Sequence, residues 1–127
     1  MKFNATISAV LFAFLIAGAG AAHAQANVDL GRIWNEQEAG WQGVWTRVGK
    51  SNSFQAVWTK GSSVVRANLQ MTVQGNVVSI SRDDTAGPGV GKAGCAYTGT
   101  VKGNTIAGQY NCSWSKAAGT WKATISR

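Results

Sequence analysis

The chain is 127 residues long, has a formal net charge of +7 and contains a single histidine, His23. This length suits one domain. Because His23 falls in a segment with the features of a cleaved leader, the mature chain has no imidazole, which excludes Ser-His-Asp and Cys-His triads and a zinc site with histidine ligands. The sequence therefore predicts a protein that is not an enzyme and that needs neither a metal nor a cofactor.

Residues 1–24 have the features of a secretory signal peptide. Lys2 precedes an uncharged apolar run, and Ala22-His23-Ala24 has the small-x-small pattern that signal peptidase recognises. The apolar run is shorter than the roughly 20 residues that a membrane span requires. We expect cleavage after Ala24, no membrane span, and a periplasmic or secreted single domain of residues 25–127 whose formal net charge, without Lys2, is about +6.

Residues 28–39 are the only stretch with helical periodicity. Leu30, Ile33 and Trp34 follow the i, i+3, i+4 spacing of one helix face. We therefore expect one short helix or turn at the start of the mature domain.

From Trp41 onward the apolar period changes to two, and β-branched and aromatic residues alternate with short Gly, Asn and Ser turns. Seven strands can be marked, at about 41–48, 53–60, 63–74, 77–83, 94–102, 105–114 and 120–126. Short turns make neighbouring strands antiparallel. The sequence predicts an all-β fold, a small antiparallel up-and-down barrel of about seven to eight strands with a short N-terminal helix, and a β-sandwich is the alternative.

The two cysteines can be placed opposite each other from turn chemistry alone. Gly103-Asn104 supplies a two-residue turn whose glycine accepts the positive φ of a primed hairpin, and this register brings Cys95 opposite Cys112. The position is a non-hydrogen-bonded one, where Cα atoms lie about 4.5 Å apart and a disulfide can bridge the strands. We predict a Cys95–Cys112 disulfide, which is typical of an oxidising compartment.

The turn Gly75-Asn76 sets the pairing register of the second hairpin in the same way. It pairs Val73 with Val78 and Met71 with Ile80, so that both strands place apolar residues on one face. That face is expected to form the core.

Carboxylate pairs are the remaining route to catalysis, because a glycosidase needs two convergent carboxyl groups. Glu36 and Glu38 do not share a face of the predicted helix, and adjacent Asp83 and Asp84 point to opposite faces if extended. We expect neither pair to be catalytic.

A glycine-rich segment, residues 83–94, contains a run that partly matches a phosphate-binding loop. Ala86 stands where the pattern has its first glycine, and Ala93 stands where it has a hydroxyl. We therefore interpret the segment as a mobile loop, which is also a place where a binding site can lie.

Tryptophan is unusually frequent, with six residues in the mature chain. A small barrel needs large side chains to fill it, and tryptophans near strand ends can instead form an exposed platform for sugar rings, an apolar ligand or a protein. We assign Trp45, Trp58 and Trp121 to the core and Trp34, Trp41 and Trp114 to a possible ligand-binding platform.

Gly43-Val44-Trp45, on the first predicted strand, resembles the G-x-W signature of the calycins, the superfamily of lipocalins, avidins and small periplasmic metalloprotease inhibitors. The resemblance implies that Trp45 packs near the closed end of a barrel, against an arginine after the last strand, here Arg127. The chain departs from that pattern in its short length, in its seven marked strands rather than eight, and in lacking a recognisable avidin biotin site. The longer stretch 41–47 also resembles small exported proteins of proteobacteria, which implies no function.

The sequence thus predicts an exported binding protein whose ligand is a small apolar molecule, a glycan or a protein. The alternatives are an inhibitor of a secreted or periplasmic enzyme, implied by the calycin resemblance, and a structural component of the envelope. The basic charge allows an anionic partner, although single cations on solvent faces commonly serve solubility alone. No specific nucleic-acid binding is expected. Inward tryptophans that touch one another would argue against a ligand deep in the barrel.

Overall fold

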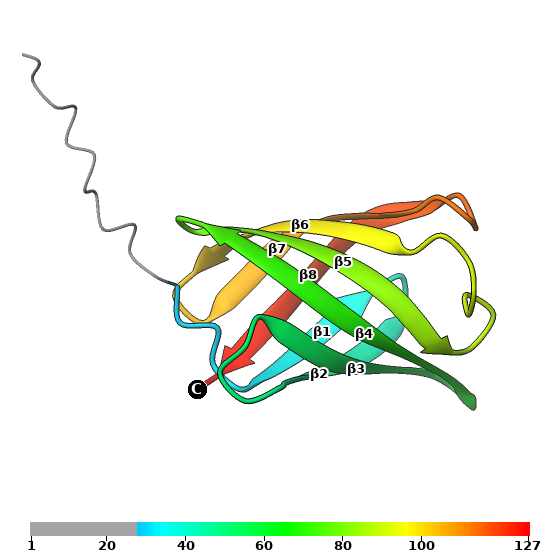
Figure 1. Ribbon diagram of the computed structural model, residues 1–127, viewed down its shortest axis with the longest axis horizontal. Helices are drawn as coiled ribbons and strands as arrows, with labels where there is room; N and C mark the ends of the chain where they lie inside the picture. The colour runs from blue at the N-terminus through cyan, green and yellow to red at the C-terminus, as the bar shows by residue number, and fades with distance from the viewer. Residues whose placement is uncertain (1–27) are drawn as a thin grey trace, which may run out of the picture.

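The computed structural model describes residues 28–127, which form a closed antiparallel barrel of eight strands (Figure 1). Each strand pairs with the next, and pairing of the last strand with the first closes the barrel. The predicted signal peptide and its cleavage site lie outside the described residues. The strands are β1 (Ile33–Glu38), β2 (Trp41–Arg47), β3 (Ser53–Lys60), β4 (Ser63–Gln74), β5 (Val77–Ala86), β6 (Cys95–Lys102), β7 (Thr105–Cys112) and β8 (Ala117–Ser126).

The sheet is a single closed up-and-down barrel, so the sandwich alternative is excluded. Between residues 28 and 127, no helix is long and apolar enough to cross a membrane.

The segment expected to be helical contains a strand instead. Ile33–Glu38 form β1, which pairs with β2 on one side and with β8 on the other. Exposed and buried residues alternate along it, with Trp34, Glu36 and Glu38 facing the interior. The helical prediction is wrong because hydrogen bonding on both edges of β1 outweighs a spacing carried by only three apolar residues.

The other predicted elements correspond to β2 to β8. The bounds of β3 and β4 match the prediction, whereas β5 continues to Ala86 and β8 begins three residues earlier than expected. Both predicted hairpin registers are confirmed, because Cys95 is opposite Cys112 and Met71 is opposite Ile80. Cys95 and Cys112 form a disulfide, with their Cα atoms 4.1 Å apart.

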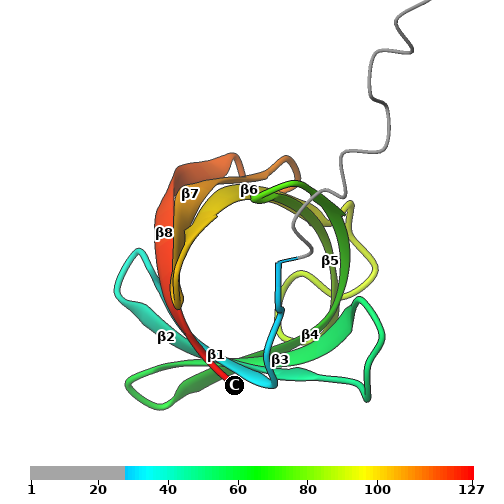
Figure 2. The ribbon, with the colours of Figure 1, turned by 90° about the vertical axis from the view of Figure 1, so that its left-hand side faces the viewer.

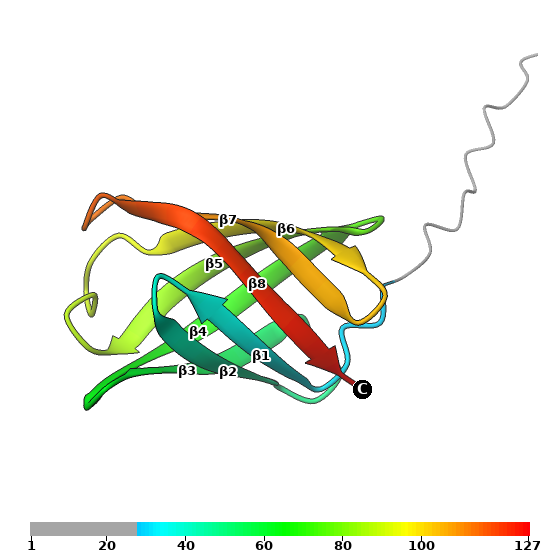
Figure 3. The same ribbon diagram turned by 180° about the vertical axis from the view of Figure 1, so that it is seen from behind.

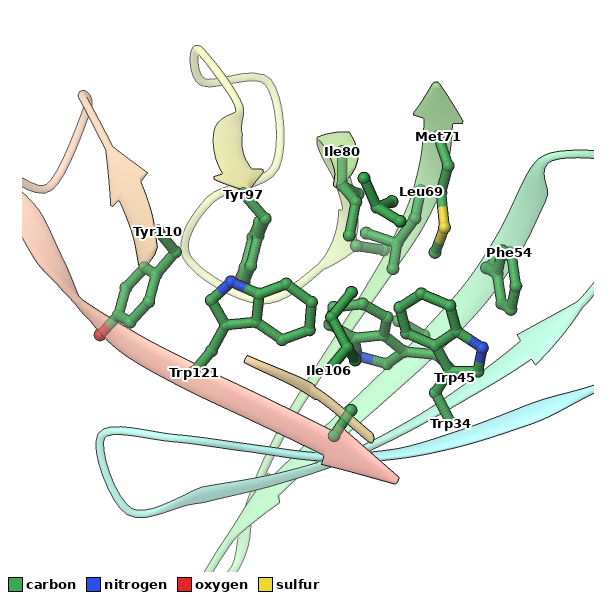
Figure 4. Close-up of a cluster of buried hydrophobic side chains, with 14 of the residues drawn as sticks. Trp34, Trp45, Phe54, Leu69, Met71, Ile80, Tyr97, Ile106, Tyr110 and Trp121 are labelled. Carbon is green, nitrogen blue, oxygen red and sulfur yellow. The ribbon is translucent and has the colours of Figure 1, made fainter. Parts of the chain in front are cut away.

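Aromatic rings fill the interior of the barrel (Figure 4). Trp45 is completely buried, and its ring centroid lies 5.6 Å from that of Trp34, 5.3 Å from that of Trp121 and 5.7 Å from that of Tyr97. Phe54 also packs against Trp34, with ring centroids 5.3 Å apart. The inward tryptophans therefore touch one another, and the middle of the barrel is occupied by side chains.

The two ends of the barrel differ. At one end, here called the closed end, residues 28–32 run across the opening before β1 begins (Figure 2), and Leu30 is buried there. The indole Nε1 of Trp34 donates a hydrogen bond of 2.7 Å to the Leu30 carbonyl, which ties this segment to the core. The opposite end, here called the mouth, is formed by the connections 39–40, 61–62, 87–94 and 113–116 (Figure 3).

Arg127, which the calycin resemblance places against Trp45, lies at the closed end. Its guanidinium donates a hydrogen bond of 3.0 Å to the Gly103 carbonyl and forms an ion pair of 3.2 Å with Asp29. The side chain is 42 % exposed, so it lies at the surface, outside the ring cluster around Trp45.

Candidate functional site: the mouth cavity

A cavity of about 220 Å³ lies at the mouth, above the aromatic core. Its walls are aromatic, and the side chains of Trp41 and Trp114 are only partly buried there. Its charged lining consists of three side chains from two strands, Glu38, Arg82 and Asp84. The aromatic lining residues are Trp41, Trp58, Tyr110 and Trp114.

The arginine of this lining is held by side chains on three strands. Arg82 and Asp84 are two residues apart on β5, so both face inward, and they form a two-pronged ion pair with N–O distances of 2.6 and 3.0 Å. The third guanidinium nitrogen donates a hydrogen bond of 3.0 Å to the Tyr97 hydroxyl. The guanidinium also lies 4.2 Å from the centroid of the Trp58 ring. Arg82 is thereby fixed in one position within the cavity.

Two carboxyl groups from β1 lie beside this arginine. Glu36 Oε2 accepts a hydrogen bond of 2.7 Å from the Trp58 indole, and Glu38 Oε1 accepts one of 2.5 Å from the Tyr97 hydroxyl. Glu36 is only 1 % exposed, and its second oxygen, Oε1, has no hydrogen-bond partner among the described residues. A buried carboxylate oxygen without a partner is costly, so a compensating proton or cation is expected near it.

Burial and, to a smaller extent, the charge of neighbouring Glu38 raise the pKa of Glu36 to about 8, against the opposing effect of the Trp58 hydrogen bond. Burial also raises the pKa of Glu38, although the Tyr97 hydrogen bond and the charge of Arg82 oppose it. Glu36 is therefore protonated at neutral pH. A protonated Glu36 can donate to Glu38, which gives the otherwise unpartnered oxygen a hydrogen bond.

Gly43, the glycine of the G-x-W sequence, makes room for this arrangement. A Cβ atom at this position would lie 2.6 Å from Glu36 Oε2 and 2.8 Å from Trp58 Nε1. Both distances are too short for van der Waals contact. The absence of a side chain at Gly43 therefore permits the hydrogen bond between Trp58 and Glu36.

The glycine-rich connection 87–94 packs against the site. Pro88 lines the cavity, and a Cβ atom at Gly89 would collide with Asp84 Oδ2 and lie 3.1 Å from the Trp114 ring. Glycine at this position therefore lets the backbone lie directly over the Asp84 carboxylate.

The six tryptophans divide differently from the expected grouping. Trp41 and Trp114 border the mouth cavity, whereas Trp34 is 0 % exposed and packs in the core near the closed end. Trp34 was predicted to join the platform with tryptophans near strand ends, but the alternation of β1 turns its side chain inward. Trp58 is buried as expected of a core residue and also forms one wall of the cavity. Trp45 and Trp121 are buried in the core.

Sequence reasoning missed the charged and hydroxyl groups of the site, namely Arg82, Tyr97 and Tyr110, and it gave Glu36, Glu38 and Asp84 no binding role. The signal was available for β5, because extending its alternation beyond Ile80 turns Arg82 and Asp84 inward. The same alternation along β1 was not recognised, because residues 28–39 were predicted to be helical.

Glu36 and Glu38 share one face of β1, which faces the interior of the barrel, so the expectation that they lie on different faces is wrong. Only Glu38 of this pair lines the cavity, whereas Glu36 lies beneath it and is almost fully buried. Asp84, on β5, also lines the cavity, but both of its carboxylate oxygens accept hydrogen bonds from Arg82. Among residues 28–127, no group of three or more histidine, cysteine or acidic side chains is arranged to hold a metal ion.

The fold and this lining define the chain as a closed eight-stranded antiparallel barrel with a small polar and aromatic cavity at one end. This architecture is compatible with a calycin-like barrel. The chain matches no protein-family model, no curated protein and no solved structure.

Proposed function

We propose that this protein is an exported, non-enzymatic binding protein whose site is the mouth cavity. The observation that carries the proposal is the contrast between the filled interior and the cavity above it. The rings of Trp34, Trp45 and Trp121 stack on one another inside the barrel, while the half-buried Trp41 and Trp114 border open space at the mouth. Large apolar side chains that remain partly exposed around a concave site favour a ligand there.

The dimensions of the cavity limit the ligand. Ligand pockets commonly measure about 300 to 1,000 Å³, and the mouth cavity, at about 220 Å³, is smaller. It therefore suits one small molecule, or one chemical group of a larger partner, and not a long apolar chain threaded through the barrel. The disulfide is compatible with export to an oxidising compartment.

The non-enzymatic role is supported by the chemistry of the lining. Both oxygens of Asp84 accept bonds from Arg82, and one oxygen of Glu38 accepts from Tyr97. Groups held in this way are better suited to fixed recognition than to proton transfer with a substrate.

The proposal is tested by recording ¹H–¹⁵N spectra of the indole groups while small sugars, apolar molecules and amines are added. A ligand should shift the Trp41 and Trp114 signals, and Trp114→Ala should weaken its binding at least tenfold. Val44→Ala, on the outer face of β2, is the matched control and should leave binding unchanged. A ligand that shifts only signals far from the mouth, or a screen that detects turnover lost in Glu38→Gln, would contradict the proposal.

A further inference from the structure

The mouth cavity has an electrostatic imbalance that bears on the nature of its ligand. Three carboxyl groups, those of Glu36, Glu38 and Asp84, surround one guanidinium, that of Arg82. The Arg82 guanidinium donates two hydrogen bonds to Asp84 and one to Tyr97. Its charge is therefore matched to Asp84, and the glutamate pair is left to share a proton or to find another cation.

The aromatic walls of the cavity also favour a cationic ligand. Tryptophan and tyrosine rings attract a cation that lies within about 6 Å of the ring centroid, and rings that surround a site can hold an alkylammonium group. Arg82 already lies over the Trp58 ring, and Lys60 Nζ lies 5.9 Å from the centroid of the Trp41 ring. Within residues 28–127, no cation lies over the rings of Trp114 and Tyr110, and both rings line the cavity together with Glu38.

The kind of cation follows from the donor set. The described residues contain no cluster of three or more side chains suited to a metal ion, so the acidic groups are not arranged as a metal site. The cavity walls are mainly apolar rings, which a strongly hydrated ion does not contact favourably. A cation with an apolar surface can pack against the aromatic rings and also pair with the Glu38 carboxylate.

We propose that the mouth cavity binds a small organic cation of the alkylammonium class, which pairs with Glu38, packs against Trp114 and Tyr110, and takes the place of the proton shared by Glu36 and Glu38. This inference rests on the proposed function, because it names the ligand class of the same site.

A consequence of the proposal is that affinity rises with pH. The raised pKa of Glu36, about 8, means that the pair holds an extra proton below that pH and loses it above. A cation and this proton compete, so binding is stronger where the proton has left. The other groups facing the pair are Arg82, Asp84, Tyr97 and Tyr110, with Lys60 at the rim; the pKa values of both tyrosines are raised by burial, which keeps them neutral over this range.

The test compares choline with 3,3-dimethyl-1-butanol, a neutral molecule of the same shape, by calorimetry and indole NMR at pH 6 and pH 9. Choline should bind at least about tenfold more tightly than the alcohol. It should also bind about a hundredfold more tightly at pH 9 than at pH 6, because a ligand that displaces one proton gains up to tenfold per pH unit below the pKa of about 8. Glu38→Gln should reduce choline binding to the level of the alcohol. Val44→Ala is the control.

Equal binding of choline and the alcohol at the mouth would overturn the cationic ligand while leaving a mouth binding site in place. No shift of the Trp41 and Trp114 signals with either probe would also overturn it. The screen of sugars and apolar molecules then decides separately whether the mouth binds anything. If Glu38→Gln fails to fold, Trp114→Ala and the pH comparison on the unaltered protein still decide between the outcomes.

Discussion

The two ends of the barrel use arginine in different ways. At the closed end, Arg47 donates to the backbone carbonyls of Ser51, Lys50 and Gly31, at 2.6, 2.9 and 3.3 Å. At the mouth, Arg82 donates only to side chains, those of Asp84 and Tyr97.

This difference separates structural groups from groups of a site. Bonds to backbone carbonyls satisfy acceptors that the chain leaves unpaired at strand ends and loops, so they stabilise the fold. Side-chain networks beside a cavity hold polar groups in place, and the hydrogen-bond donors and acceptors that the network does not use can face that cavity. The comparison therefore predicts that substitutions in the core and at the closed end change stability, whereas those at the mouth change binding.

The largest effect is expected for Trp45→Ala. Trp45 is completely buried among Trp34, Trp58, Tyr97 and Trp121. Its Nε1 has no hydrogen-bond partner among the described residues, so its contribution is apolar packing and its removal leaves no other group unpaired. We expect a loss of about 3–5 kcal/mol in the free energy of unfolding, measured by urea denaturation.

Trp114→Ala is the matched substitution at the mouth. Because Trp114 is only partly buried, it should reduce the free energy of unfolding by about 1 kcal/mol or less. If Trp45→Ala and Trp114→Ala lost similar free energies of unfolding, Trp114 would contribute to packing as much as Trp45 does. The proposed difference between core and mouth would then be wrong.

Gly43→Ala tests the junction between the core and the mouth. The new methyl group would press on Glu36 Oε2 and Trp58 Nε1, and overpacking of this kind typically costs about 1–3 kcal/mol. Gly119→Ala is the control, because the nearest neighbours of its new methyl group are atoms of the Tyr110 ring at 3.2 Å or more, a looser contact than at Gly43. Thermal melts of the two variants measure the difference. A Gly43→Ala protein as stable as the Gly119→Ala protein would mean that Trp58 and Glu36 can separate without loss.

The barrel could be predicted from the sequence because its signals are local. Alternation along residues 63–74 and the turns Gly75-Asn76 and Gly103-Asn104 determine faces and registers, and the register of the second turn also places Cys95 opposite Cys112. Each of these signals acts within one strand or one hairpin.

The mouth site could not be predicted in the same way because it is assembled from distant strands. The hydrogen bond between Tyr97 and Glu38 joins residues 59 positions apart, and that between Trp58 and Glu36 joins residues 22 apart. Reading residues 28–39 as a helix also separated the two glutamates that β1 places together. Their pairing follows once Ile33–Glu38 are known to form a strand, because its alternation turns both side chains to the same face.

A smaller effect than that of Gly43→Ala is expected for Arg47→Ala at the closed end. Its three bonds join the segment before β1 to the connection between β2 and β3, but two of them lie in exposed positions, where water replaces a lost donor. We expect a loss of about 1 kcal/mol, since a typical intramolecular hydrogen bond contributes about that much and solvation offsets the rest. Arg32→Ala, also exposed at this end, should change the free energy of unfolding by no more than about 0.5 kcal/mol. Urea denaturation of both variants, with choline binding measured alongside, tests the comparison directly.

Arg47→Ala should lower the urea midpoint and leave the Trp41 and Trp114 indole shifts unchanged, because a bond to the backbone at one end of a rigid barrel does not reposition side chains at the other. A weakened mouth site in Arg47→Ala would show that the two ends are coupled, and the closed end would then have to be counted among the groups that position the ligand.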